Sequence, residues 1–188
     1  WFNQGESSDL VGRNHDSGKG SPSNQKRLFG DPLRTEHSTH GAAFVYERYG
    51  NFGLLLAYAI AGHHTGLANG RDSGQRKPLM ERLEGDLEPL YPEWEATLSF
   101  PDQAPKPSLK VYRPHQMFQL AFFVRMQFSI LVDADYQDTE AYYEWVDGEP
   151  GKRGGFPDLK DLQSELDHHL GELPKDDNRL NELRVSIL

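Results

Sequence analysis

The sequence contains no cysteine, which excludes disulfide bonds, thiolate metal ligands and a cysteine nucleophile. Any metal site must therefore use histidine, aspartate and glutamate, whose nitrogen and oxygen donors suit borderline and hard divalent ions. Long apolar runs are also lacking, since the longest, Leu54 to Ala61, is about one-third of the length that crosses a membrane. We therefore expect a cytoplasmic protein with no membrane partner.

Positive charge is scarce. The 188 residues include 20 lysines and arginines against 29 aspartates and glutamates, a net charge of −9. The excess of negative charge is local, because the segment from Asp133 to Asn178 holds 14 acidic and 4 basic residues. The charges elsewhere nearly balance, so a local basic path for a phosphate backbone stays open, although no strong basic stripe is visible.

Strand-like alternation is also rare, and the length suits one domain with a sizeable core. We predict an all-α fold, with residues 1–188 as a single domain of helices and long connecting loops. Residues 1–35 read mostly as loops. The helix that begins at Pro114 is apolar nearly all round, which predicts a central position. The remaining predicted helices span 23–29, 37–49, 51–64, 79–90 and 159–170, with a last one capped by Asp177 and carrying Leu180, Leu183 and Ile187.

Four polar features stand in order along this helical pattern. They are His15-Asp16-Ser17-Gly18-Lys19, Glu36-His37-Ser38, Gly62-His63-His64-Thr65-Gly66, and Asp133-Ala134-Asp135 at the end of the apolar helix. An adjacent His-Asp pair can place both side chains on one metal, or let the carboxylate bridge two. A carboxylate ending an apolar helix is costly to bury unless it is paired or metal-bound.

These features supply six nitrogen and oxygen ligands for one or two divalent ions, namely His15, Asp16, His37, His63, His64 and Asp135. Two ions about 4 Å apart would clamp a phosphodiester and activate water for in-line attack. Each feature alone is weak evidence for a metal site, because isolated histidines are usually structural. The four in this order indicate a metal centre.

The residue patterns of the four features resemble those of the HD superfamily of metal-dependent phosphohydrolases. Within it, the sequence is similar to the HD nuclease domain of the CRISPR-associated nuclease-helicase, particularly of subtype I-C. The resemblance covers about residues 8–188. It is carried by His-Asp-x-Gly-Lys, His-Ser-x-x-Gly-Ala, Ala-Gly-His-His-x-Gly-Leu and Phe-Ser-x-Leu-Val-Asp-Ala-Asp-Tyr-x-Asp-Thr-Glu, which begin at residues 15, 37, 61 and 128.

The resemblance implies a role for each matching residue. Asp16 is the bridging ligand and a catalytic residue. Lys19 is a catalytic residue that contacts phosphate or the attacking water, and Thr139 takes the place of a substrate-binding hydroxyl. The implied metal ligands are His15, Asp16, His37, His63, His64 and Asp135.

The resemblance also implies an HD-domain helical bundle and a divalent-metal-dependent nuclease. Its substrate would be single-stranded DNA, in antiviral defence by type I CRISPR systems of prokaryotes. The implied cofactor is one or two ions of manganese, nickel, cobalt, iron or magnesium. The implied partners are a helicase domain or subunit, the RNA-guided Cascade complex and a phage anti-CRISPR inhibitor.

Two departures and two alternatives accompany the resemblance. The family carries a further metal-binding histidine upstream of the His-Asp pair, and no histidine precedes His15 here. Arg13, Asn14 and Ser17 stand where the family has apolar residues.

One alternative is an HD-type nucleotide phosphohydrolase, and the other is a non-catalytic HD domain that serves as a protein-binding module. His40, His115, His168 and His169 are interpreted as structural or exposed rather than as ligands.

Overall fold

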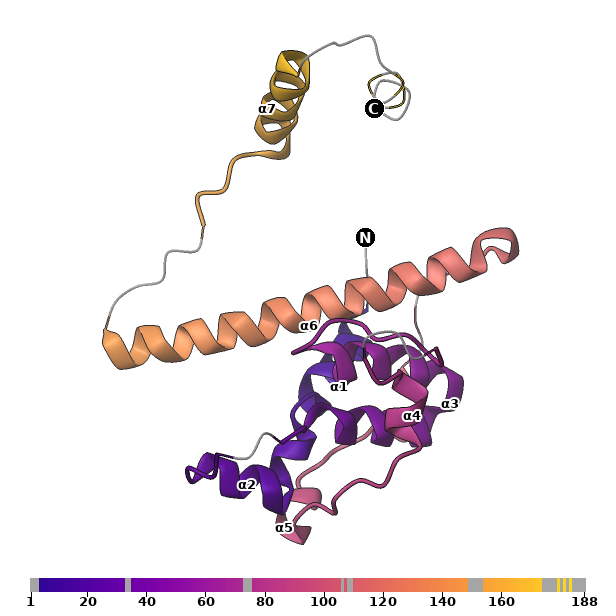
Figure 1. Cartoon of the computed structure of the whole chain (residues 1–188), viewed down its shortest axis with the longest axis vertical. Coiled ribbons are helices and arrows are strands. Elements are labelled where there is room, and N and C mark those ends of the chain that lie inside the picture. The colour runs from indigo at the N-terminus through magenta and orange to yellow at the C-terminus, as the bar shows by residue number, and fades with distance from the viewer. Residues whose placement is uncertain are drawn as a thin grey trace. The chain divides into compact units, whose positions relative to one another are not determined.

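The computed structural model describes residues 4–32, 35–72, 76–105, 107, 110–148, 154–173, 179, 181 and 183. All regular structure within these ranges is helical, so the predicted all-α fold is confirmed (Figure 1). The elements are α1 (Gly5–Asn14), η1 (Ser17–Gly20), α2 (Pro22–Leu28), α3 (Ser38–Gly62), α4 (Leu79–Leu83), α5 (Pro92–Glu95), η2 (Arg113–His115), α6 (Gln116–Asp147) and α7 (Leu159–Glu172).

Contacts divide the chain into two compact units, Trp1–Gly148 and Glu149–Leu188. All the predicted site residues belong to the first unit, and a single domain over 1–188 stays a prediction. The second unit contains α7, which begins at the side-chain cap of Asp158 and confirms the helix predicted over 159–170. For the predicted last helix, Asp177, Leu180 and Ile187 lie outside the described residues.

The prediction that residues 1–35 are mostly loops is wrong at α1. This helix buries one stripe, made of Ser7, Leu10, Val11 and Asn14. The spacing is helical, but half of the stripe is polar, which explains why the apolar pattern was too weak to reveal it. The short helix predicted near 23–29 is confirmed as α2. The helix predicted over 79–90 is wrong beyond Leu83, where α4 ends just before Gly85.

The element α3 is a helical hairpin rather than one rod. Gly50 has φ 56° and ψ −131°, a backbone conformation that favours glycine, and it separates the two predicted helices. A straight helix of these 25 residues would be about 37 Å long. Instead the Nε2 atoms of His37 and His64, which flank its two ends, lie 2.9 Å apart. The reversal at Gly50 therefore brings both ends of α3 to one place.

The core of the first unit is formed where α1, α3 and α6 pack against one another. Its largest fully buried apolar side chains are Phe123, Leu10, Leu56, Ile60 and Leu79. The approach of α1 to α3 depends on Gly41, because a β-carbon there would overlap the carbonyl oxygen of Asn14. This contact fixes the end of α1 against the start of α3.

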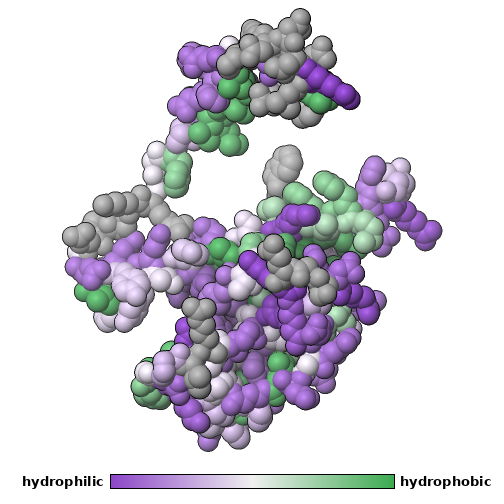
Figure 2. Space-filling view, viewed as in Figure 1, coloured by the Kyte–Doolittle hydropathy of each residue, from purple (hydrophilic) through white to green (hydrophobic). Residues whose placement is uncertain are grey.

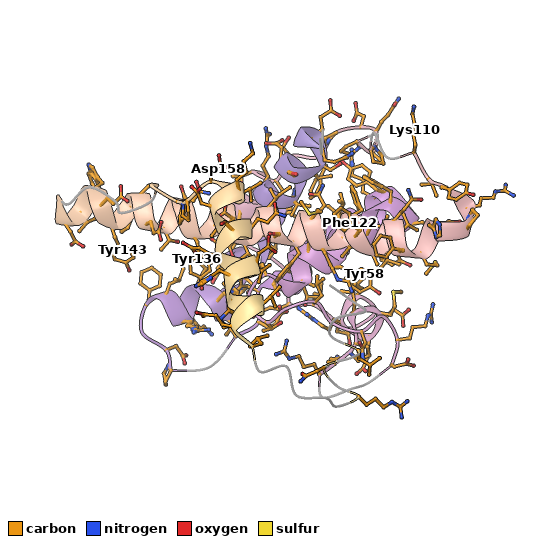
Figure 3. All side chains as sticks on the ribbon, turned by 90° about the horizontal axis from the view of Figure 1, so that it is seen from above. Tyr58, Lys110, Phe122, Tyr136, Tyr143 and Asp158 are labelled. Carbon is orange, nitrogen blue, oxygen red and sulfur yellow. The ribbon has the colours of Figure 1, made fainter. Side chains whose placement is uncertain are left out.

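The helix after Pro114, predicted to be central because it is apolar nearly all round, is buried on one side only within the first unit. In α6 only Phe123, Val124, Gln127 and Leu131 are buried, because α1 and α3 cover one side of it within the first unit. Met117 and Phe118 are exposed, and Figure 2 shows hydrophobic surface over this N-terminal half. In Figure 3 the side chains of Tyr136 and Tyr143 stand out from the C-terminal half.

The helix also continues to Asp147, so Asp135 lies inside α6 and not at its end as predicted. Within the described part of the chain, the stretch Arg113–Asp147 is the one helix long and apolar enough to cross a membrane by length and composition. The same helix gives Phe123 and Leu131 to the core. The core helices of soluble proteins pass this test as well.

Candidate metal centre

The fold gathers the predicted ligands around the carboxylate of Asp16. His15 and Asp16 follow the last residue of α1, His37 precedes the first residue of α3, and His63 follows its last. On one side of the carboxylate, Oδ1 lies 3.2 Å from Nε2 of His37 and 3.7 Å from Nε2 of His63. His64 joins this side through its 2.9 Å contact with His37.

The other carboxylate oxygen faces a different set of groups. Oδ2 of Asp16 lies 2.5 Å from Nζ of Lys19 and 3.2 Å from Nε2 of His15. That imidazole nitrogen is in turn 3.6 Å from Oδ1 of Asp135, which reaches the cluster from α6. The two oxygens of Asp16 therefore connect a three-histidine side with a side made of His15, Asp135 and Lys19.

Hydrogen bonds to the backbone set the tautomer of two of these imidazoles. Nδ1 of His15 lies 2.7 Å from the carbonyl oxygen of Gly12, and Nδ1 of His63 lies 2.7 Å from that of Ile60. A carbonyl only accepts, so Nδ1 must carry the hydrogen and Nε2 of the neutral ring presents a lone pair. Both lone pairs face Asp16. Metal-binding histidines are commonly held by this kind of outer hydrogen bond.

Lone pairs that face a carboxylate repel it unless a proton or a cation lies between them. Among the described residues, Nε2 of His15, Nε2 of His63 and Oδ1 of Asp16 are buried without a hydrogen-bond partner. Buried polar atoms left in this state cost free energy. A divalent cation accepting electron pairs from these atoms would remove that cost, so the donor set fits a metal ion.

The electrostatics of the cluster favour an ionised Asp16. Burial raises the pKa of its carboxyl, but His15, His37, His63 and Lys19 lower that pKa by more, so it lies far below the usual range. Burial lowers the pKa of His15, but Asp16 within hydrogen-bonding distance, with lesser contributions from Gly12 and Asp135, raises it overall. Burial lowers the pKa of His64, and the neighbouring imidazoles of His63 and His37 lower it further. A metal ligand must be deprotonated, which an ionised Asp16 and a less basic His64 satisfy.

Four residues can meet on one ion. The potential ligand atoms of Asp16, His37, His63 and His64 all lie within 4.8 Å of one another. His15 and Asp135 lie on the Oδ2 side and would complete a second position only if Lys19 moved from the carboxylate oxygen that it now contacts. The three-histidine side is thus the better formed of the two.

An arginine that the sequence analysis missed braces the cluster. The guanidinium of Arg82 donates to the carbonyl oxygen of Ala61 at 3.0 Å, to Oγ1 of Thr39 at 2.8 Å, and to Oε1 of Glu36 at 3.0 Å. Glu36 in turn accepts from the backbone N–H groups of Ser38 and Thr39 at the start of α3. Arg82 therefore ties the start of the hairpin to its end, where the ligating histidines lie. Glu36 could have been noticed as a carboxylate next to a helix start, whereas no sequence signal marks Arg82.

Other candidate residues lie outside the cluster. Thr139 is exposed on α6, one turn beyond Asp135, so its substrate-binding role stays a prediction. His40 is buried, and its Nε2 lies 2.8 Å from the carbonyl oxygen of Glu88, as expected of a structural histidine. His115 and His168 are exposed. The interpretation of these three histidines as non-ligands fits their positions.

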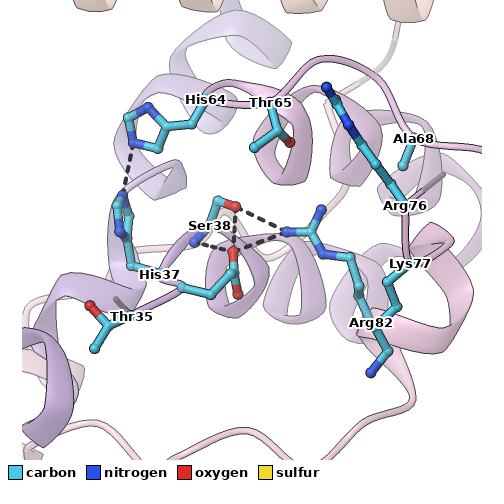
Figure 4. A pocket seen from close by; sticks show the side chains of 10 residues that line it. Thr35, His37, Ser38, His64, Thr65, Ala68, Arg76, Lys77 and Arg82 are labelled. Carbon is cyan, nitrogen blue, oxygen red and sulfur yellow. Dashed lines mark hydrogen bonds and ion pairs between the residues drawn. The ribbon is translucent and has the colours of Figure 1, made fainter. Parts of the chain in front are cut away.

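A pocket of about 560 Å³ adjoins the cluster. Figure 4 shows the imidazoles of His37 and His64 along one side of it, and the side chains of Arg76, Lys77 and Arg82 along the opposite side. The pocket therefore extends from the histidine side of the cluster to three basic side chains.

No protein-family model matches the chain, and a search of curated proteins finds no match either.

Proposed function

We propose that this protein is a divalent-metal-dependent phosphodiesterase that cleaves single-stranded DNA. The observation that supports it best is the set of imidazole Nε2 lone pairs from His15 and His63 directed at the ionised carboxylate of Asp16. Such an acceptor-rich arrangement needs a proton or a cation among its atoms, and a divalent ion would engage several of these acceptors at once. It is also typical of sites that polarise a phosphate.

The residues that would hold the ion are Asp16, His37, His63 and His64, and His15 with Asp135 would hold a second one. Manganese, nickel, cobalt, iron and magnesium are the candidate ions. When bound, a divalent ion supplies Lewis-acid stabilisation of phosphate charge and lowers the pKa of water. Asp16 connects both groups of ligands through its two oxygens. Lys19, half-exposed beside Oδ2, places an ammonium where a phosphate oxygen of the substrate can bind.

The choice of DNA follows from the resemblance of the four features to the HD nuclease domain of the CRISPR-associated nuclease-helicase. On that basis we place the protein in type I antiviral defence, in the prokaryotic cytoplasm. Its partners would be a helicase domain or subunit and the Cascade complex, with a phage anti-CRISPR protein as its inhibitor. The nucleotide phosphohydrolase remains the second candidate, because the pocket beside His37 and His64 carries three cations.

The test is degradation of circular single-stranded DNA by the purified protein with manganese, with EDTA as the metal-free control. We expect cutting with manganese and none with EDTA. Asp16→Ala is expected to abolish cutting, because it removes the carboxylate that both groups of ligands share. Asp9→Ala is the matched control, since Asp9 is an exposed aspartate on α1 whose ion pair is with Arg13 at the surface.

Three results would contradict the proposal. Full activity of Asp16→Ala would separate the cluster from catalysis. Release of product from small nucleotides without DNA cutting would favour the nucleotide phosphohydrolase. Stoichiometric binding to the effector complex, with neither bound metal nor turnover, would favour the binding module.

A further inference from the structure

The pocket beside the histidine cluster has the composition of an anion site. Besides its three basic side chains, its wall carries the hydroxyl groups of Thr35, Ser38 and Thr65. Glu36, the acidic residue among the described lining residues, is already paired with Arg82 at 3.0 Å. The hydroxyl groups of Thr35 and Ser38 already donate to Asn24 and Glu36, so the pocket offers a phosphate group its excess positive charge and the hydroxyl of Thr65.

The three cations differ in how far they are engaged. Arg82 is held by its hydrogen bonds to Glu36, Thr39 and Ala61. Lys77 lies 3.6 Å from the exposed Glu81 of α4. Arg76 is exposed, and within the described part of the chain it forms no ion pair. Its guanidinium is thus the group that a ligand would engage at the lowest cost.

Arg76 also lies close to the histidine cluster. Its Nη1 lies 3.6 Å from the place that a β-carbon on Gly66 would occupy. Gly66 has φ +85° and forms the turn directly after His64 and Thr65. In Figure 4 the Arg76 side chain extends beside Thr65 on the wall opposite His37. A phosphate held by Arg76 would therefore lie within the same pocket as the ligating histidines.

We propose that this pocket binds the phosphate of the nucleotide next to the one that is cleaved, with Arg76 as its main ligand. The inference rests on the proposed phosphodiesterase function and adds to it the residue that holds the strand beside the cluster. A volume of about 560 Å³ accommodates one nucleotide, since pockets of this range hold molecules of that size. The same phosphate chemistry is offered by a free nucleotide and by a DNA strand.

The experiment measures binding to the metal-free protein in EDTA, where no cutting takes place. The probe is a fluorescent single-stranded oligonucleotide, followed by anisotropy at several salt concentrations. Arg76→Gln is expected to weaken binding roughly tenfold, because it removes one charged hydrogen bond to phosphate. The slope of log affinity against log salt should also fall by about 0.7, the value for one contact with a single strand.

The matched control is Arg71→Gln, which removes the same charge from a nearby exposed arginine that does not line the pocket. It should bind as the wild type does, and thermal melts should show all three proteins equally folded. In competition, deoxyadenosine monophosphate should displace the probe and deoxyadenosine should not. Displacement by the monophosphate at concentrations equal to those required of an unlabelled strand would assign the pocket to free nucleotides.

Three results would overturn the inference. They are equal affinity of Arg76→Gln and wild type, an equal loss in Arg71→Gln, and the absence of binding by the wild type. Each concerns binding without metal. If the wild type binds the oligonucleotide as expected and Arg76→Gln weakens that binding, but the wild type cuts no DNA with manganese, the proposed function is overturned and the phosphate pocket stays in place.

Discussion

Arg82→Met tests whether the guanidinium braces the two ends of the α3 hairpin. The Arg82 side chain is 14% exposed and its partner Glu36 is 53% exposed. Removing one member of a fully buried ion pair costs about 3–5 kcal/mol. Glu36 keeps water and backbone partners here, so we expect the free energy of unfolding to fall by about 3 kcal/mol. For a chain of this length that corresponds to a fall in Tm of roughly 6–12 °C.

The assay is urea denaturation of the metal-free protein, with Lys77→Met as the matched control. Lys77 lines the same pocket, but its ion pair with Glu81 is 3.6 Å long and exposed. That variant should lose about 0.5 kcal/mol or less. Equal destabilisation of Arg82→Met and Lys77→Met would refute the reasoning, because the brace would then contribute no more than a surface charge.

The pH dependence gives the same test a second readout. Burial raises the pKa of Glu36, but hydrogen bonds from Ser38 and Thr39 and the charge of Arg82 lower it by more. A carboxyl with a lowered folded pKa stabilises the protein above its unfolded pKa of about 4.3, and this stability is lost as pH falls through the folded pKa. The difference in stability between wild type and Arg82→Met should therefore shrink below about pH 4.

Two further substitutions have matched controls at helical positions of the same unit. Gly41→Ala should destabilise the protein by about 1–3 kcal/mol in thermal melts, because its β-carbon overlaps the carbonyl oxygen of Asn14. In the control Gly12→Ala the new β-carbon meets nothing within 4 Å, so this variant should instead raise stability by up to about 1 kcal/mol. A Gly41→Ala variant as stable as the wild type would show that α1 does not approach α3 so closely. Asp135→Asn should slow manganese-dependent DNA cutting at least tenfold, because it removes the carboxylate near His15, whereas the exposed Asp138→Asn should cut normally. Equal rates for these two variants would exclude Asp135 from the centre.

The sequence was informative where chemistry and local helix geometry coincide. The adjacent pairs His15-Asp16 and His63-His64, together with His37 and Asp135, were selected as ligands from the order of the four polar features, and the structure brings all six to one cluster. The break between helices 37–49 and 51–64 was also visible, because Gly50 interrupts the apolar pattern.

The remaining features depend on tertiary contacts that a linear pattern does not contain. Arg82 acts across 43 residues to reach Thr39, and nothing near it in the sequence marks that role. The apolar residues of α6 do not indicate which of its faces meet a partner, so its burial was overestimated. The stripe of α1 was missed because Ser7 and Asn14 are polar yet buried.

The two arms of the α3 hairpin have equal length, with twelve residues before Gly50 and twelve after it. Each residue of an α-helix advances the chain by 1.5 Å and turns it by about 100°. Inserting or deleting one residue in either arm would therefore rotate its terminal histidine away from Asp16 as well as shift it along the axis. The loops of this fold can change in length without that penalty. The number of residues between Gly50 and each of these histidines must therefore be kept if His37, His63 and His64 are to reach Asp16.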